Sequence, residues 1–192
     1  MKKGFKIAIC GACGTGKTTL SNVLAEKLNM PVLTNKGRDI AKLIGISNFN
    51  EPIEPTKHVL CHYATLNERI SGELDCKDGF IADRSVLDML TFWELDTKKY
   101  YPQLNENYSG MIKSHLTNNP YDLLLYLPIE FDGKDDGHRS IGEHRNLEDK
   151  ILSRLLNESI GKVSSKNILT IRGSVLERLE AVFQYIRSIE SI

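Results

Sequence analysis

One stretch near the beginning of the chain constrains the fold more than any other. It reads Gly11-Ala12-Cys13-Gly14-Thr15-Gly16-Lys17-Thr18 and matches the pattern G-x-x-x-x-G-K-[ST]. An apolar run, residues 5–10, precedes it, and in residues 19–28 the apolar side chains are spaced for one face of a helix. A strand, a glycine-rich loop and a helix in this order are the context that a phosphate-binding loop requires.

The chemistry of this loop indicates that the chain binds a nucleoside triphosphate. Glycines let successive backbone N–H groups point at phosphate oxygens, and the following helix adds the positive end of its dipole. We expect Lys17 to reach the β- and γ-phosphates and the Thr18 hydroxyl to bind Mg²⁺. The predicted nucleotide-binding set runs from Gly11 to Thr19. The loop is expected to be exposed, so Lys17 is predicted to be dispensable for the fold.

Length and charge limit the classes of function. With 192 residues the chain is expected to form a single domain, 1–192, that buries a real core. Lys and Arg number 25, as do Asp and Glu, so the formal net charge is zero. A polynucleotide partner is therefore disfavoured, because proteins that bind one usually carry a basic surface.

Cysteine usage and hydropathy indicate the compartment. Cys10 and Cys13 have the C-x-x-C spacing, but Cys10 lies in the predicted strand and a disulfide to Cys13 would obstruct the phosphate-binding loop. A reducing, cytoplasmic location fits this pattern. No apolar stretch approaches membrane-spanning length, so no membrane partner is expected.

Strands and helices are expected to alternate along the chain. The predicted strands are residues 5–10, 30–33, 80–83, 121–128 and 167–171. The predicted helices are residues 19–28, 40–44, 56–74, 86–95, 109–116, 143–159 and 175–186, with residues 96–108 as a surface excursion. This order predicts an α/β protein with the three-layer P-loop NTPase fold: a five-stranded parallel sheet, helices on both faces and a lid segment.

The tripeptide Asp83-Arg84-Ser85 follows the third predicted strand and separates the classes of P-loop protein. A mechanochemical ATPase of the AAA type is expected to have a glutamate after the acid, to activate water, whereas this chain has Arg84. A GTPase is expected to carry N-K-x-D, and the segment 35–38 has arginine in place of the acid. Asp-Arg-Ser instead resembles deoxynucleoside kinases and nucleoside monophosphate kinases.

That resemblance implies roles for several residues. Asp83 would accept the proton of the acceptor or hold Mg²⁺, and these two roles stay open. Arg84 would contact substrate phosphate or an acid. Arg38 follows the second predicted strand, where the related kinases place a residue that binds the acceptor.

A segment after the fourth strand, residues 130–142, has three glycines and little apolar content. Its Asp136-Gly137-His138-Arg139, taken with the two earlier motifs, resembles the NadR-type ribosylnicotinamide kinase domain. The resemblance implies a lid in which Arg139 and Arg145 neutralise charge on the transferred phosphoryl group. It also implies ATP as the donor, Mg²⁺ as cofactor and a small-molecule acceptor. The sequence does not identify the acceptor or the preferred base of the donor nucleotide.

Two alternatives stay open beside a small-molecule kinase. One is a nucleotide-dependent switch or ATPase regulatory module, and the other is a polynucleotide 5′-kinase. A homodimer is a further possibility on which the sequence carries no signal.

The histidines invite a metal hypothesis, since His58 and His62 are four residues apart on one predicted helix. His138 lies within the predicted lid and His144 just after it. No cysteine or carboxylate completes a zinc pattern such as H-E-x-x-H, so packing or surface roles are favoured for all of them.

Overall fold

The computed structural model describes residues 4–49, 51–131 and 142–190, and its centre is a parallel sheet. The strands are β1 (Lys6–Cys10), β2 (Val32–Leu33), β3 (Phe80–Asp83), β4 (Leu123–Tyr126) and β5 (Ile168–Thr170). They lie in the order β2-β3-β1-β4-β5, and every pairing is parallel. The predicted five-stranded parallel sheet is therefore confirmed.

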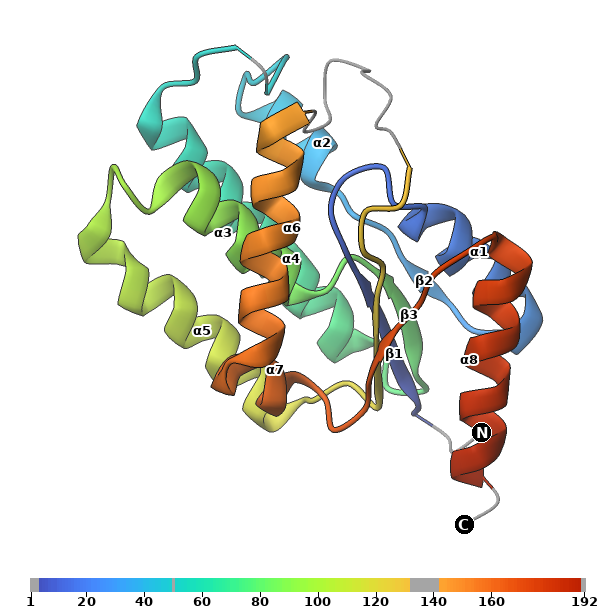
Figure 1. The fold of residues 1–192 in the computed structure, drawn as a ribbon. Helices are drawn as coiled ribbons and strands as arrows, with labels where there is room; N and C mark the ends of the chain where they lie inside the picture. The colour runs from blue at the N-terminus through green and yellow to red at the C-terminus, as the bar shows by residue number, and fades with distance from the viewer. Residues whose placement is uncertain (1–3, 50, 132–141, 191–192) are drawn as a thin grey trace.

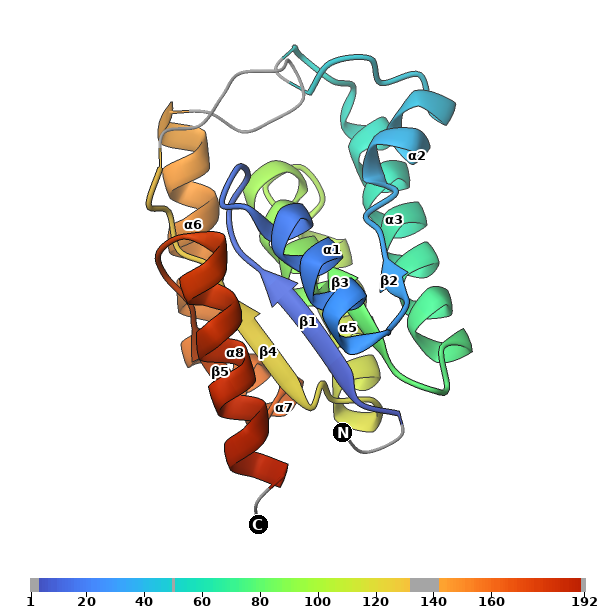
Figure 2. The ribbon, with the colours of Figure 1, turned by 90° about the vertical axis from the view of Figure 1, so that its right-hand side faces the viewer.

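Helices cover both faces of this sheet (Figures 1 and 2). On one face lie α1 (Lys17–Leu28) and α8 (Val175–Glu190). On the other lie α3 (Pro55–Asp75), α4 (Val86–Phe92), α5 (Asn105–Asn118), α6 (Gly142–Asn157) and the short α7 (Ser159–Ser164). The remaining helix, α2 (Gly37–Leu43), follows β2 and contacts α3.

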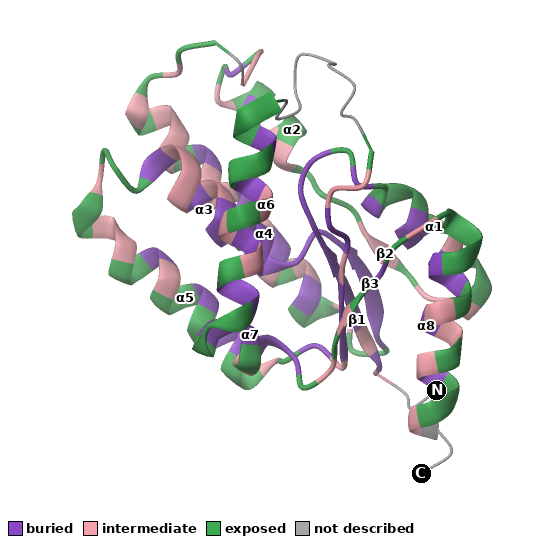
Figure 3. Ribbon diagram, viewed as in Figure 1, coloured by how far each residue is buried: buried purple, intermediate pink, exposed green. Residues whose placement is uncertain are grey.

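The alternation of side chains along the central strand produces two separate cores. Ile7 and Ile9 of β1 pack under α1 and α8, whereas Ala8 and Cys10 face the larger helical layer. All four residues are fully buried, and in Figure 3 the central strands are purple, as is most of the loop after β1 apart from the exposed Gly14 and Gly16. A strand buried on both faces needs no polar alternation, which explains the continuous apolar runs in the sequence.

The predicted surface excursion over 96–108 is only partly right. The chain continues from α4 into a π-helical turn, η1 (Trp93–Thr97), then forms a 3₁₀ turn, η2 (Pro102–Leu104), and α5 already begins at Asn105. Tyr108 is fully buried and stacks on Trp93, with the ring centroids 4.3 Å apart. Burial of these two rings draws the segment onto the helical layer, against its polar composition.

Two smaller predictions are also wrong. The apolar spacing of residues 56–74 predicts Leu60 on the buried face of that helix, but Leu60 of α3 is 54% exposed, because the buried stripe follows Tyr63, Leu66 and Ile70 instead. The helix predicted over 143–159 ends at Asn157, and α7 follows it as a separate element. Within the described part of the chain, no helix has both the length and the apolar character needed to cross a membrane.

Candidate functional site

The loop between β1 and α1 has the backbone geometry of an anion cradle. A side chain at Gly11 would place its Cβ 2.4 Å from the Leu127 carbonyl oxygen, so only glycine fits where the loop passes β4. Gly16 has a φ of 90°, in the left-handed region that favours glycine. These two glycines bend the chain back over the end of the sheet, and α1 begins directly afterwards at Lys17.

Backbone N–H groups from Gly14 to Thr18 lack protein acceptors. Among the described residues, none of them donates a hydrogen bond to the backbone or to a side chain. The neighbouring N–H groups of Gly11 and Cys13, in contrast, each donate to a carboxylate. Unpaired N–H groups at a helix N-terminus are what a phosphate binds, so this part of the loop fits a phosphate group.

Lys17 does not extend into solvent, so the expectation of an exposed loop is only partly right: Gly14, Gly16 and Thr18 are exposed, whereas Lys17 is buried. Its side chain is buried, with Nζ donating to the carbonyl oxygens of Gly11 and Ala12 at 2.6 Å each. Burial and the nearby Arg84 lower the pKa of Lys17. The ammonium holds two carbonyls of its own loop, and the prediction that Lys17 is dispensable for the fold stays a prediction.

Thr18 and Asp83, the two predicted Mg²⁺ ligands, lie together. The Thr18 hydroxyl donates to Oδ2 of Asp83 at 2.7 Å, from the first turn of α1 to the end of β3. The backbone there is fixed by Arg69 of α3, which donates to the carbonyl oxygens of Asp83 and Thr34. A hydroxyl and a carboxylate at this distance form an oxygen donor pair of the kind that Mg²⁺ prefers.

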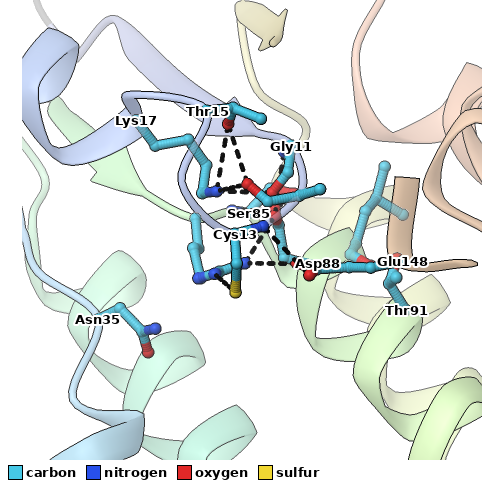
Figure 4. Close-up of polar contacts among 12 residues, drawn as sticks. Gly11, Cys13, Thr15, Lys17, Asn35, Ser85, Asp88, Thr91 and Glu148 are labelled. Carbon is cyan, nitrogen blue, oxygen red and sulfur yellow. Dashed lines mark hydrogen bonds and ion pairs between the residues drawn. The ribbon is translucent and has the colours of Figure 1, made fainter. Parts of the chain in front are cut away.

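Two buried carboxylates that sequence reasoning missed hold the loop from the side (Figure 4). Asp88 of α4 accepts from the Gly11 N–H at 3.2 Å, and Glu148 of α6 accepts from the Cys13 N–H at 3.1 Å. Asp88 also accepts from the N–H and hydroxyl of Ser85 at 2.8 and 2.7 Å. Its spacing from Ser85 is that of a capping box, the one signal that could have revealed it. Burial raises the pKa of Asp88.

Arg84 points inward. It has a φ of 80°, which is strained for a residue with a side chain. Its guanidinium lies 3.4 Å from Asp88 and from Glu148, and it donates to Sγ of Cys13 at 3.2 Å. Burial opposes its charge, but Cys13, Glu148 and Asp88 outweigh burial and raise its pKa. Arg84 thus joins the phosphate-binding loop to both carboxylates, and its predicted contact with substrate stays a prediction.

Arg145 reaches the loop as well. Its Nε donates to the Cys13 carbonyl at 2.6 Å and its Nη1 to the Phe131 carbonyl at 2.7 Å. Its Nη2 is buried without a partner among the described residues. The predicted lid arginine therefore lies against the phosphate-binding loop with one donor unused, whereas Arg139 and most of the predicted lid lie outside the described residues.

Arg178 of α8 is a site residue that no motif indicated. Its Nη1 donates to the Thr15 carbonyl at 2.6 Å, and its Nη2 donates to Glu130 at 2.8 Å. Glu130 also accepts from the Gly173 N–H at 3.0 Å. Arg178 lies 163 positions after Thr15, so no local pattern could have revealed this contact.

The last two predicted site residues are Arg38 and Thr19. Arg38 is exposed on the first turn of α2, after β2, at the edge of the sheet where the parallel strands end. Thr19 is exposed on the first turn of α1. Asn35, just before α2, accepts from the Gly37 N–H at 3.0 Å and is drawn apart from the loop contacts in Figure 4.

Solved structures share this fold at low sequence identity. Thymidylate kinase from Candida albicans aligns with a TM-score of 0.73 and 17% identity, over 98% of this chain and 93% of that one. Deoxyadenosine kinase from M. mycoides aligns with a TM-score of 0.70 and 17% identity, over 96% and 100%. The NadR protein aligns with a TM-score of 0.64 and 17% identity, over 89% of this chain but only 46% of that one.

The sequence comparisons are more limited. A search of curated proteins gave no significant match. A family model described as an AAA domain matches residues 6–178, which include the phosphate-binding loop, Asp83 and Arg178. The chain therefore belongs to this AAA domain family of P-loop proteins, and it has the fold of nucleoside and nucleotide kinases.

Proposed function

We propose that the protein transfers the γ-phosphoryl group of ATP to a nucleoside, a nucleotide or a nucleoside-like small molecule. One observation carries this proposal: unpaired N–H groups of a phosphate-binding loop lie beside an acid, Asp83, that is followed by arginine rather than glutamate. Kinases with this fold, such as thymidylate kinase and deoxyadenosine kinase, support the same class of reaction.

The loop residues supply the donor site. The N–H groups from Gly14 to Thr18 would bind phosphate oxygens, and Lys17 would leave its two carbonyls to meet the β- and γ-phosphates. Arg145 has an unused buried donor that would stabilise charge on the transferred group. Catalysis would therefore rest on positioning and on charge stabilisation.

Thr18 and Asp83 would hold Mg²⁺, because their oxygens lie 2.7 Å apart beside the predicted phosphate site. The ion would neutralise charge on the phosphates. Asp83 either accepts the proton of the acceptor or serves the metal alone. Arg84 and Arg38 are proposed to meet the acceptor.

An acceptor screen tests this proposal. ADP release is measured with ATP and, in turn, nucleosides, nucleoside monophosphates and nicotinamide riboside, with Lys17→Ala as the inactive control. We expect at least one acceptor to stimulate turnover in the wild type only. Stimulation by none of them, together with slow ATP hydrolysis, would favour a nucleotide-dependent switch; stimulation by an oligonucleotide 5′ end would favour a polynucleotide kinase.

Compartment and assembly are part of the same proposal. The four cysteines are free thiols, and Cys10 and Cys13 are buried at the site, which fits a reducing cytoplasm. We propose one domain, residues 1–192, which predicts a single unfolding transition in urea. The homodimer stays a prediction, and sedimentation velocity, which reports the oligomeric state in solution, tests it.

A further inference from the structure

The histidines of α3 meet a carboxylate that their sequence neighbourhood lacks. His58 and His62 lie one helical turn apart, with ring centroids 6.2 Å apart and planes at 16°. Asp96, more than thirty positions away on the π-helical turn η1, comes to the same place. One ligand atom from each of the three residues lies within 4.8 Å of the other two.

We propose that His58, His62 and Asp96 form a zinc site. Two imidazole nitrogens and one carboxylate oxygen are a protein ligand set that Zn²⁺ accepts, with a fourth position left for water. Mg²⁺ and Ca²⁺, which take oxygen ligands, do not suit it. Ligands about 2.1 Å from zinc lie about 3.4 Å apart in a tetrahedron, so small side-chain rotations would close the group around the ion.

The two imidazoles are available for this role. Among the described residues, no hydrogen bond is made by a ring nitrogen of His58 or His62. The ring of His62 is oriented by edge contacts with Trp93 and Tyr108, at centroid distances of 5.8 and 6.3 Å. All three candidate ligands are half-buried, so an ion can enter from solvent and still lose much of its water.

A fourth residue holds the carboxylate from outside. Nε2 of His144, in the first turn of α6, lies 3.3 Å from Oδ1 of Asp96. A ligand held by an outer hydrogen bond is already oriented for the metal, and loss of such a partner costs about 10–100-fold in affinity. The π-helical form of η1 agrees with this, because π-turns are frequent at functional sites.

Zinc at this position would join α3 to η1, with α6 beside them. Figure 1 shows the first turns of α3 and α6 at the end of the molecule where the phosphate-binding loop lies. None of the three proposed zinc ligands is among the residues assigned to the proposed kinase site.

Calorimetric titration of the full-length, untagged, EDTA-treated chain with Zn²⁺ in a phosphine reductant tests the proposal. We expect one ion per chain in the wild type, at least about 100-fold weaker binding in His62→Ala and Asp96→Asn, and about 10–100-fold weaker binding in His144→Asn. The matched control is Glu94→Gln, a carboxylate of the same turn that pairs with Arg154 and Lys98. It should bind zinc as the wild type does.

Two outcomes would overturn the proposal: a wild type that takes up no zinc, or an Asp96→Asn variant with unchanged affinity. Circular dichroism without metal shows whether each variant is folded. Should a variant not fold, the absorption spectrum of the wild-type Co²⁺ complex identifies the ligand atoms of the metal instead. A spectrum of nitrogen and oxygen ligands supports the site, whereas a thiolate-to-cobalt band assigns the metal to the cysteines.

Discussion

The position of Asp83 suits either a general base or a Mg²⁺ ligand. Its carboxylate accepts from the Thr18 hydroxyl, and the residue ends β3 beside the phosphate-binding loop. If it is the general base of the proposed reaction, Asp83→Asn should lower kcat by about 10²–10⁴-fold while ATP still binds. If it serves Mg²⁺ instead, raising the metal concentration should recover part of the loss. Steady-state kinetics at several Mg²⁺ concentrations separates the two roles.

Thr18 supplies the control for that experiment. Thr18→Ser keeps the hydroxyl and should retain near-normal activity, whereas Thr18→Ala should need more Mg²⁺. Equal metal dependence in Thr18→Ala and the wild type would contradict a shared metal role for Thr18 and Asp83.

His62 should make stability depend on pH when no metal is present. Burial lowers its pKa to about 4, and of its charged neighbours Asp96 raises the pKa while His58 lowers it. In the unfolded chain its pKa is about 6.5, so between these values the unfolded state binds more protons and stability falls as the pH falls. Between pH 7 and pH 5 the loss should be about 2 kcal/mol.

Urea unfolding in EDTA at the two pH values measures this loss. His62→Phe, which keeps a ring against the edges of Trp93 and Tyr108, should remove most of it. An unchanged pH dependence in His62→Phe would assign the effect to other groups.

Among the site residues, those that belong to a contiguous sequence motif could be predicted from the sequence. Thr18 and Asp83 could be paired because a strand end and a loop with known chemistry bring them to one edge of the sheet. The contacts of Glu148 and Arg178 with the loop could not be predicted, since each residue lies on a helix more than a hundred positions away in the sequence. The burial of Lys17 was missed because the motif specifies its role with phosphate and not its position without one.

Among the elements, α8 supports the phosphate-binding loop through Arg178. Arg178→Lys keeps the charge but loses the fork that joins Thr15 to Glu130. We expect a stability loss of about 1–3 kcal/mol and weaker ATP binding. Urea unfolding and nucleotide titration measure the two effects. Arg187→Lys, an exposed change on the same helix, should alter neither.

The π-helical turn η1 and α5 depend on one aromatic stack. Trp93 is 1% exposed, so Trp93→Ala should cost about 3–5 kcal/mol of unfolding free energy. Tyr108→Phe keeps the ring and loses only hydroxyl contacts at 3.4 and 3.5 Å, so it should cost less than about 1 kcal/mol. Equal losses in the two variants, measured by urea unfolding, would show that the stack is not what holds the turn.

Elements whose apolar residues form a clear run or repeat were predicted well. Elements whose path depends on packing against residues far away in the sequence were not. The strands β1, β3 and β4 follow from their apolar runs. The segment 96–108 reads as polar because most of its residues are, yet its few aromatic side chains decide its path. The local composition of a segment does not predict the burial of an aromatic side chain that packs against another helix.

For the whole molecule, nucleotide binding should appear as added stability. ATP with Mg²⁺ at about 100 times its Kd should add about 2.7 kcal/mol. For a chain of this length, this corresponds to a rise in Tm of about 5–10 °C. Lys17→Ala should show little rise, and a thermal unfolding scan with and without ligand measures both. A full rise in that variant would contradict the role of Lys17 in binding phosphate.

The contact between Thr15 and Arg178 has a consequence for biosynthesis. Thr15 of the phosphate-binding loop leaves the ribosome 163 residues before Arg178 of α8. Glu148 and Arg145, which also hold the loop, are translated late as well. A nascent chain thus carries its nucleotide motif long before it can shape it, so the capacity to bind ATP should arise only once α8 has emerged from the ribosome.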